Sequence, residues 1–181
     1  ATINEFDNLS IDFGRLTKAI DRDSTDAEDL ALNNKNRRFG GSFSADQLDW
    51  AGLNYQFNSS LAASYYLAQL DDVYRQHFFG LNHSAALGAG ELSTELRVAV
   101  SDEQGAAHAG RIDNQAWQGR IGYALNGHEV SAAAQKMRGD SAFPYIDGSN
   151  PYLVNFVQIN DFDEANERSW QLRYDYDFAA V

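Results

Sequence analysis

Hydrophobic and polar residues alternate along most of the chain with a period of two. The stretch "SWQLRYDYDF" at 169–178 does so without a break: Trp170 and Leu172 fall on one side, and Gln171 and Arg173 on the other. Because successive side chains of an extended strand point to opposite faces, this stretch predicts a strand with one aromatic and aliphatic face and one polar face.

Eight segments share this alternation at strand length. We predict strands over 8–20, 48–57, 60–70, 74–87, 91–101, 116–125, 129–138 and 169–181. Two stretches, "SLAASYYLAQLDDVYRQHF" and "HEVSAAAQKMRG", also fit an amphipathic helix. We predict strands for both stretches, because residues typical of tight hairpin turns separate the segments. These turns are Asn58-Ser59, the run 88–90 and Asn126-Gly127.

The connections between these strands differ in length in a regular way. If each strand is antiparallel to the next, the tight turns all fall at one end of the sheet. The longer connections 21–47, 102–115 and 139–168 fall at the other end, with 71–72 as a short exception. Outer-membrane barrels have short periplasmic turns and longer external loops, and strands of about ten residues cross a bilayer at a tilt. The pattern therefore predicts an all-β fold, a transmembrane antiparallel β-barrel whose apolar face meets lipid.

Composition narrows the function classes. The 181 residues suffice for a single domain over 1–181, and the formal net charge of -12 disfavours nucleic acid as a partner. Cysteine is absent, so neither a disulfide nor a thiolate site is expected. No apolar run reaches the length of a transmembrane helix.

Three arginines fall at mid-strand on the polar side: Arg97, Arg120 and Arg173, with Glu95 and Asp175 nearby. Burying so many charges in a packed core is unfavourable, whereas a water-filled lumen removes that penalty. Two roles remain open for the arginines. They guide a solute carboxylate through charge-assisted hydrogen bonds, or they line the wall and pair with the acidic residues.

The long segment 139–168 is apolar for a loop. A structureless segment of this length is usually functional or disordered, and its composition argues against disorder. We therefore predict that it folds into the mouth of the barrel rather than forming an outward lid. We expect Asp147 and Tyr152 to reach the wall near the arginines. The candidates for the constriction are Tyr145, Asp147, Ser149, Asn150 and Tyr152.

Other chemistry is weakly supported. Asp21, Asp23 and Asp26 are spaced like the start of an EF-hand loop, but Asp26 occupies the glycine position and Leu32 the final glutamate position. A solvated acidic loop is the better interpretation. The four histidines are scattered along the chain without nucleophile-elbow spacing. We predict no catalytic residue, no metal site and no cofactor.

Three stretches carry a resemblance to a known family. "GRLTKAI", "ASYYLAQLDDVYRQHFFGLNH" and "GDSAFPYIDGSNPYLVNFVQINDFDEANERSWQLRYDYDFAA" are similar to the OprD family of outer-membrane porins, also called outer membrane carboxylate channels. The resemblance implies a barrel of about eighteen strands, narrowed by inward-folded loops and lined by a ladder of basic residues. It also implies passive, substrate-selective uptake of small anionic or zwitterionic solutes that bear a carboxylate, such as amino acids and small organic or aromatic acids.

The same resemblance sets expectations for the surroundings. It implies the outer membrane of a Gram-negative bacterium, contact with membrane lipid and lipopolysaccharide, and a monomer or loose trimer. Eight strands are fewer than the family needs, so we expect this chain to be part of a larger barrel. Segments 8–20 and 169–181 should then each have an open edge or pair with strands outside this numbering. The alternative is a soluble or periplasmic β-barrel that binds a small molecule, which requires the apolar face of 169–178 to be buried in protein.

Overall fold

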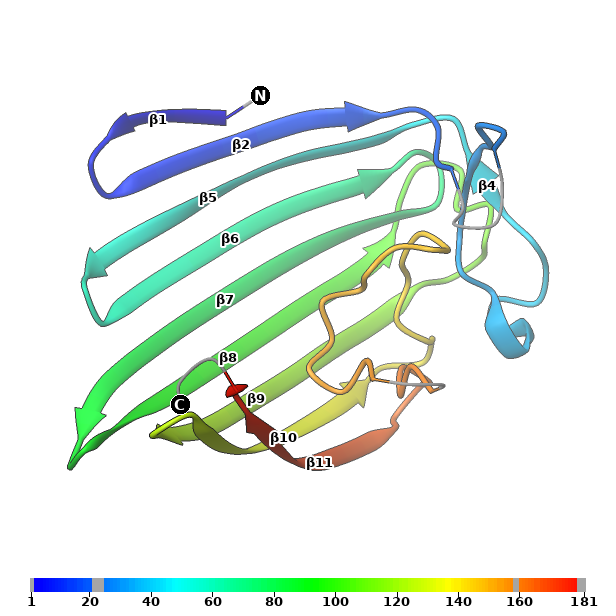
Figure 1. The fold of residues 1–181 in the computed structure, drawn as a ribbon. Helices are drawn as coiled ribbons and strands as arrows, with labels where there is room; N and C mark the ends of the chain where they lie inside the picture. Colours follow the sequence, from blue (N-terminus) through cyan, green and yellow to red (C-terminus); the bar gives the residue numbers. More distant parts are fainter. Residues whose placement is uncertain (1, 21–24, 158–159, 179–181) are drawn as a thin grey trace.

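The computed structural model describes residues 2–20, 25–157 and 160–178. One antiparallel sheet of nine strands curves into a trough (Figure 1). Each strand of this sheet pairs with its neighbours along the chain. Its strands are β1 (Thr2–Phe6), β2 (Leu9–Leu16), β5 (Leu48–Asn58), β6 (Leu61–Leu70), β7 (Tyr74–Leu87), β8 (Gly90–Glu103), β9 (Asp113–Leu125), β10 (His128–Arg138) and β11 (Arg168–Tyr176).

The eight predicted strands are all present, and both ambiguous stretches are strands. The boundaries differ at several ends. β9 begins at Asp113, three residues earlier than expected, because polar residues continue the ladder there: Asp113 pairs with Asp102 and Asn114 with Ser101. β2 ends at Leu16, so the predicted strand over 8–20 is too long.

The two edges of the sheet are β1 and β11, which lie on opposite sides of the trough (Figure 1). In the described part of the chain, they do not pair with each other and the barrel does not close. The expected open edge is found at β11 but not at β2. β2 pairs on both sides, with β5 and with the short strand β1 that sequence reasoning missed. Five residues give too little alternation to stand out as a strand.

Tight turns gather at one end of the sheet and long connections at the other, as predicted (Figure 1). Asn126 and Gly127 both have positive φ, 51° and 80°. A two-residue hairpin turn of this type matches the strand twist, which explains the Asn-Gly pair. In outer-membrane barrels the short turns lie on the periplasmic side and the long loops on the external side. We call the end with the long connections the loop end.

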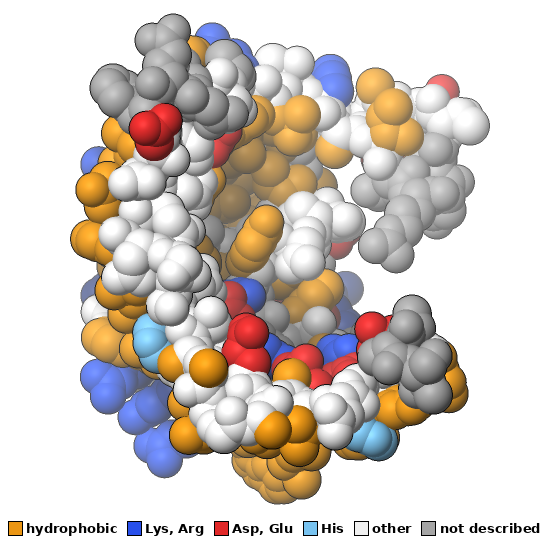
Figure 2. All heavy atoms as spheres, turned by 60° about the vertical axis from the view of Figure 1, so that its left-hand side comes forward, with side chains coloured by type: hydrophobic (Ala, Val, Ile, Leu, Met, Phe, Trp, Pro, Cys, Tyr) orange, Lys and Arg blue, Asp and Glu red, His pale blue; other side chains and the backbone are white. Residues whose placement is uncertain are grey.

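The outer face of the trough is apolar (Figure 2). Trp170 and Leu172 on β11 are 80% and 70% exposed, and no described residue covers them. The soluble alternative required this face to be buried in protein, so the structure does not support it. Such a band of exposed aliphatic and aromatic side chains is what a lipid-facing barrel wall presents.

The long connections form a separate core at the loop end. The segment 25–47 contains a two-stranded sheet, β3 (Leu30–Ala31) with β4 (Ser44–Ala45), and a short 3-10 helix, η1 (Lys35–Arg37). Its apolar side chains pack with the ends of the long strands and with the segment after β10. The buried members are Leu30, Leu32, Phe39, Ala45, Leu70, Val73, Tyr74, Ala109, Ile112, Ala142 and Ile146. Across the described ranges, no helix is long and apolar enough to cross a membrane.

Candidate functional site

The described residues between β10 and β11, 139–157 and 160–167, lie across the concave face of the trough (Figure 1). Inward-facing glutamines satisfy their irregular backbone. Gln118 Oε1 accepts a hydrogen bond from Val154 N at 2.7 Å, and Gln76 Nε2 donates to Pro144 O at 3.2 Å. Buried backbone groups outside regular structure need such partners. The segment is therefore folded inward, as predicted, and is not an outward lid. We call it the inner loop.

Apolar side chains of the inner loop fill the space above the sheet. Phe143 and Leu153 are buried against the inner faces of β8, β9 and β10, where Ala99, Ala116 and Met137 lie. Small residues on the wall let the bulky loop residues approach, and burying each large side chain stabilises the inward position by about 2 kcal/mol.

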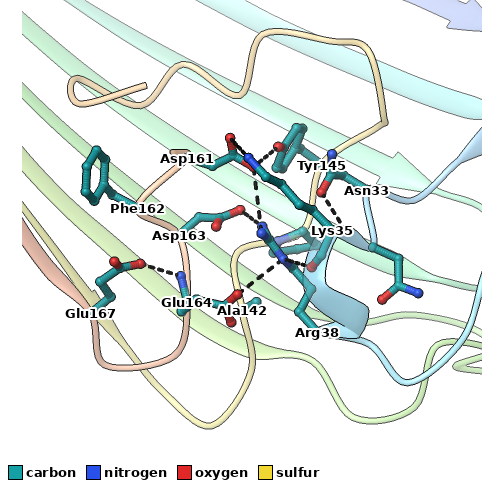
Figure 3. Close-up of polar contacts among 12 residues, drawn as sticks. Asn33, Lys35, Arg38, Ala142, Tyr145, Asp161, Phe162, Asp163, Glu164 and Glu167 are labelled. Atoms are coloured by element: carbon teal, nitrogen blue, oxygen red, sulfur yellow. Dashed lines mark hydrogen bonds and ion pairs between the residues drawn. The ribbon is translucent and has the colours of Figure 1, made fainter. Parts of the chain in front are cut away.

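A charged cluster fixes the end of the inner loop (Figure 3). Arg38 follows η1, and its side chain is only 3% exposed. Its guanidinium pairs with Asp163, lies 3.7 Å from Asp161 Oδ2 and 3.6 Å from Glu164 Oε1, and donates from Nε to Lys35 O at 2.8 Å. We call this arrangement the Arg38 cluster.

Two further contacts extend the Arg38 cluster. Lys35 Nζ lies 3.2 Å from Asp161 Oδ1, and Tyr145 OH donates to Asp161 Oδ2 at 2.9 Å. The backbone N–H of Asn33 also donates to Tyr145 O at 2.8 Å. The segment 33–38 and both ends of the inner loop are therefore held together by groups that are mostly out of water.

Burial changes the acid–base properties of this cluster. It raises the pKa of Asp163 to about 6, because loss of water outweighs the attraction of Arg38. Burial also raises the pKa of Tyr145 above its usual range, and the adjacent Asp161 carboxylate adds to that shift. Tyr145 therefore stays neutral and donates its hydrogen bond at every physiological pH.

The three predicted arginines meet in one cavity, which we call the arginine cavity. It has a volume of about 480 Å³, and the inner loop supplies Asn150 and Tyr152 to its lining. Each arginine pairs with a carboxylate of the wall. Arg97 Nη2 lies 2.5 Å from Glu95 Oε1 and Arg173 Nη2 lies 2.6 Å from Asp175 Oδ1, while Arg120 pairs with Glu129.

Glu129 was not among the sequence candidates. It lies on the polar side of β10, four residues before Ala133, which is the residue opposite Arg120. Strand register could have found it, because both residues face the same side of neighbouring strands. Three arginines and three carboxylates leave this part of the cavity lining formally balanced.

Arg97 is the wall arginine that contacts the inner loop. Its Nη1 donates to Tyr152 O at 2.8 Å, and its guanidinium carbon lies 5.8 Å from the centre of the Tyr152 ring. The predicted contact between Tyr152 and an arginine of the wall is therefore present. Arg120 and Arg173 are more exposed, with side chains 30% and 56% exposed.

The expected contact between Asp147 and a wall arginine is wrong. Asp147 Oδ1 accepts a hydrogen bond from Asn33 Nδ2 at 2.7 Å, and Asp147 N donates to Ala31 O at 2.8 Å. These bonds hold Asp147 against the segment 25–47. Its carboxylate is thus fixed to a neutral amide, away from the three guanidinium groups.

A second cavity lies beside the first, and we call it the aromatic cavity. It has a volume of about 670 Å³ and shares Glu95, Arg97, Asn150 and Tyr152 with the arginine cavity. Six aromatic side chains of the described residues take part in its lining. They are Trp50, Tyr66, Tyr74, Phe78, Tyr145 and Tyr152.

The remaining candidates, Ser149 and Asn150, line the aromatic cavity and also shape the inner loop. Ser149 Oγ donates to Ile146 O at 2.6 Å, and Asn150 Oδ1 accepts from Tyr152 N at 2.8 Å. Tyr145 is 6% exposed, so it contributes more to the Arg38 cluster than to the open surface. Whether any of these residues contacts a solute stays a prediction.

The weaker candidates gain no support. Asp21 and Asp23 of the calcium interpretation lie outside the described residues. Within the residues that the structure describes, no group of three His, Asp or Glu side chains is arranged to hold a metal ion. His77 accepts or donates a single bond, to Tyr65 OH at 2.8 Å, on the outer face of the sheet.

Comparison with known proteins gives a consistent set of relatives. The family model described as "outer membrane porin, OprD family" matches residues 1–181. Porin D of Pseudomonas aeruginosa is 30% identical over 189 residues, which cover 98% of this chain and 41% of that protein. The porin-like protein GalP of Pseudomonas putida is also 30% identical, over 99% of this chain and 43% of its own length.

Solved structures agree in fold. OccK5 (OpdH) of Pseudomonas aeruginosa is 54% identical with a TM-score of 0.92, over 98% of this chain and 48% of that structure. OccK11 (OpdR) of the same organism is 46% identical with a TM-score of 0.91, over 99% of this chain and 48% of that structure. The chain therefore spans a little under half the length of the relatives it matches.

Proposed function

Because this chain belongs to the OprD family of outer membrane porins, we propose that it provides part of the wall and the constriction of a substrate-selective channel. The channel takes up small carboxylate-bearing solutes passively across the bacterial outer membrane, and it is not an enzyme. Amino acids and small organic or aromatic acids are the proposed solutes. The main observation in support of this proposal is that Arg97 lines both the arginine cavity and the aromatic cavity.

The arginine cavity supplies the groups that a carboxylate needs. Arginine presents a planar set of N–H donors that matches a carboxylate in a two-point hydrogen bond. Each wall arginine already holds one carboxylate, so an entering solute exchanges with Glu95, Glu129 or Asp175 instead of desolvating a bare cation. Exchange between equivalent partners keeps binding weak enough for release, which conduction requires.

The aromatic cavity supplies the complementary surface. A solute whose carboxylate lies at Arg97 can place an apolar or aromatic group against Trp50, Tyr66 or Phe78. Ring contacts of this kind contribute about 1 kcal/mol each beyond area burial. The acidic partners of the arginines also suit a solute that carries an amino group, so zwitterions fit as well as simple anions.

The decisive experiment reconstitutes the full-length channel in a planar bilayer. We expect discrete single-channel conductance, with current block that rises with the concentration of benzoate or an amino acid. Benzyl alcohol, which has the same ring without the carboxylate, is the matched solute control and should block far less. Absence of conductance, or equal block by both solutes, would refute the proposed function.

A further inference from the structure

Three basic side chains form a patch on the outer face at the loop end. Lys136 on β10 and Arg168 on β11 are directly opposite each other in the sheet. Arg138 lies two residues beyond Lys136 and therefore on the same face. Its guanidinium carbon is 5.7 Å from the centre of the Trp117 ring, and Trp117 is the partner of Lys136 on β9. We call Lys136, Arg138 and Arg168 the outer basic patch.

The outer basic patch has no acidic partner among the described residues. Salt bridges to carboxylates are present for other basic residues at the same end: Arg75 lies 3.5 Å from Asp102, and Arg111 lies 3.3 Å from Asp113. None connects a residue of the patch to a carboxylate in the ranges 2–20, 25–157 and 160–178. Like charges placed opposite each other across a strand pair repel.

The patch adjoins the lipid-facing band. Trp170 lies two residues after Arg168 on the same face of β11, farther from the loop end, and it is 80% exposed. Leu172 and Ile121 lie farther still along this face and are 70% and 51% exposed. Trp117 and Trp170 stand where aromatic residues mark the interface between hydrocarbon and headgroups. Because outer-membrane barrels have their long loops on the external side, we place the three cations at the headgroup level of the outer leaflet.

We propose that the outer basic patch binds the phosphate groups of an outer-leaflet glycolipid, the lipid A part of lipopolysaccharide. Arg138 and Arg168 supply forked donors for phosphate oxygens, and Lys136 supplies a point charge between them. The acyl chains then lie along Trp170 and the apolar band. An amphiphile satisfies both surfaces at once, whereas a free phosphate ion uses only the charges, so the lipid is the occupant that the site fits.

This proposal does not depend on the solute site, because the patch lies on the opposite face of the sheet. The test uses the full-length channel in detergent and measures binding of diphosphoryl lipid A by titration. We expect K136Q/R138Q/R168Q to weaken binding about tenfold or more, since each cation near an anionic headgroup adds to the attraction. R75Q/R111Q is the matched control, because these arginines lie at the same end but already pair with aspartates.

Two further arms identify the ligand. Lipid A without its phosphates should bind the wild-type channel as weakly as diphosphoryl lipid A binds the triple variant. Inorganic phosphate at millimolar concentration should not displace the lipid. Unchanged conductance in a planar bilayer shows that the triple variant folds. If the triple variant does not fold, lipid A binding is measured with the single variant K136Q instead. Equal binding by wild type and variant, equal binding of dephosphorylated lipid A, or displacement by free phosphate would each overturn the assignment.

Discussion

Arg38 and Arg97 both pair with carboxylates beside the inner loop, yet their side chains are 3% and 20% exposed. Arg38 is enclosed by Asp161, Asp163 and Glu164, so loss of the cation would leave the buried Asp163 carboxylate without its charged partner. Arg97 faces two cavities and holds one carboxylate that water and solutes can reach. An arginine–carboxylate pair thus anchors the inner loop at Arg38 and is open to exchange with a solute at Arg97. The difference in burial of the two pairs determines these two roles.

Deleting residues 143–156 tests the anchored region most severely. The inner loop lies across the concave face, so its removal should open the path that it narrows. We expect conductance of the full-length channel to rise several-fold, since pore conductance follows open cross-section. An unchanged conductance in a planar bilayer would place the loop outside the ion path.

Replacing Arg38 with Met removes the cation but keeps an unbranched side chain of similar length. Leaving the buried Asp163 carboxylate without a cation should destabilise loop docking by about 3–5 kcal/mol. The change should lower the thermal unfolding midpoint in detergent and make single-channel current fluctuate. Arg15→Met is the control, because Arg15 pairs with Asp49 at an exposed site. If R38M leaves the unfolding midpoint unchanged and the single-channel current steady, the Arg38 cluster does not hold the inner loop in place.

Asp163 gives the anchored region a pH dependence. Its pKa is raised from 3.8 to about 6, so the stability linked to its protonation is fully present below pH 3.8 and lost as pH rises through 6. The difference corresponds to on the order of 3 kcal/mol. Relative to wild type, D163N should show a smaller fall in unfolding midpoint between pH 5 and pH 7.5. D147N is the control variant, because the carboxylate of Asp147 is exposed. Equal dependence of the unfolding midpoint on pH for D163N and wild type would show that Asp163 does not cause the pH dependence.

Arg97→Gln tests the exchanging region. Gln keeps a hydrogen-bond donor but loses the charge, so block by benzoate should weaken about tenfold, which corresponds to roughly 1.4 kcal/mol. The unfolding midpoint should change little, because the residue has access to water. Comparable weakening by R15Q, an arginine outside both cavities, would mean that net charge rather than the site determines block.

Asp147→Ala should have the smallest effect. Its carboxylate lines the aromatic cavity but is bonded to Asn33 and not to a guanidinium group. Removing one negative charge should raise anion preference modestly, by less than twofold, as measured by reversal potential in a salt gradient. N33A, which frees the carboxylate without removing it, should shift the reversal potential less or in the opposite direction.

The two regions also differ in how well sequence reveals them. Alternation is a local signal, so it identified the strands, the apolar outer face and the inward side of Arg97, Arg120 and Arg173. The Arg38 cluster is not local: Arg38 and Asp163 lie in irregular segments 125 residues apart, and neither stands in a periodic pattern. The bond between Asp147 and Asn33 was missed for the same reason, because two loops must dock before it exists.

The central claim is that a solute carboxylate exchanges with the wall carboxylate at Arg97. Single-channel block by benzoate in Glu95→Gln tests it most directly, with D163N as the parallel variant of the anchored region. If exchange occurs, removing the competing carboxylate should make benzoate block the E95Q channel several-fold more strongly than the wild-type channel. Benzoate block of the D163N channel should match that of wild type. Block that is unchanged or weaker in E95Q would contradict exchange and leave the Arg97–Glu95 pair as a fixed part of the wall.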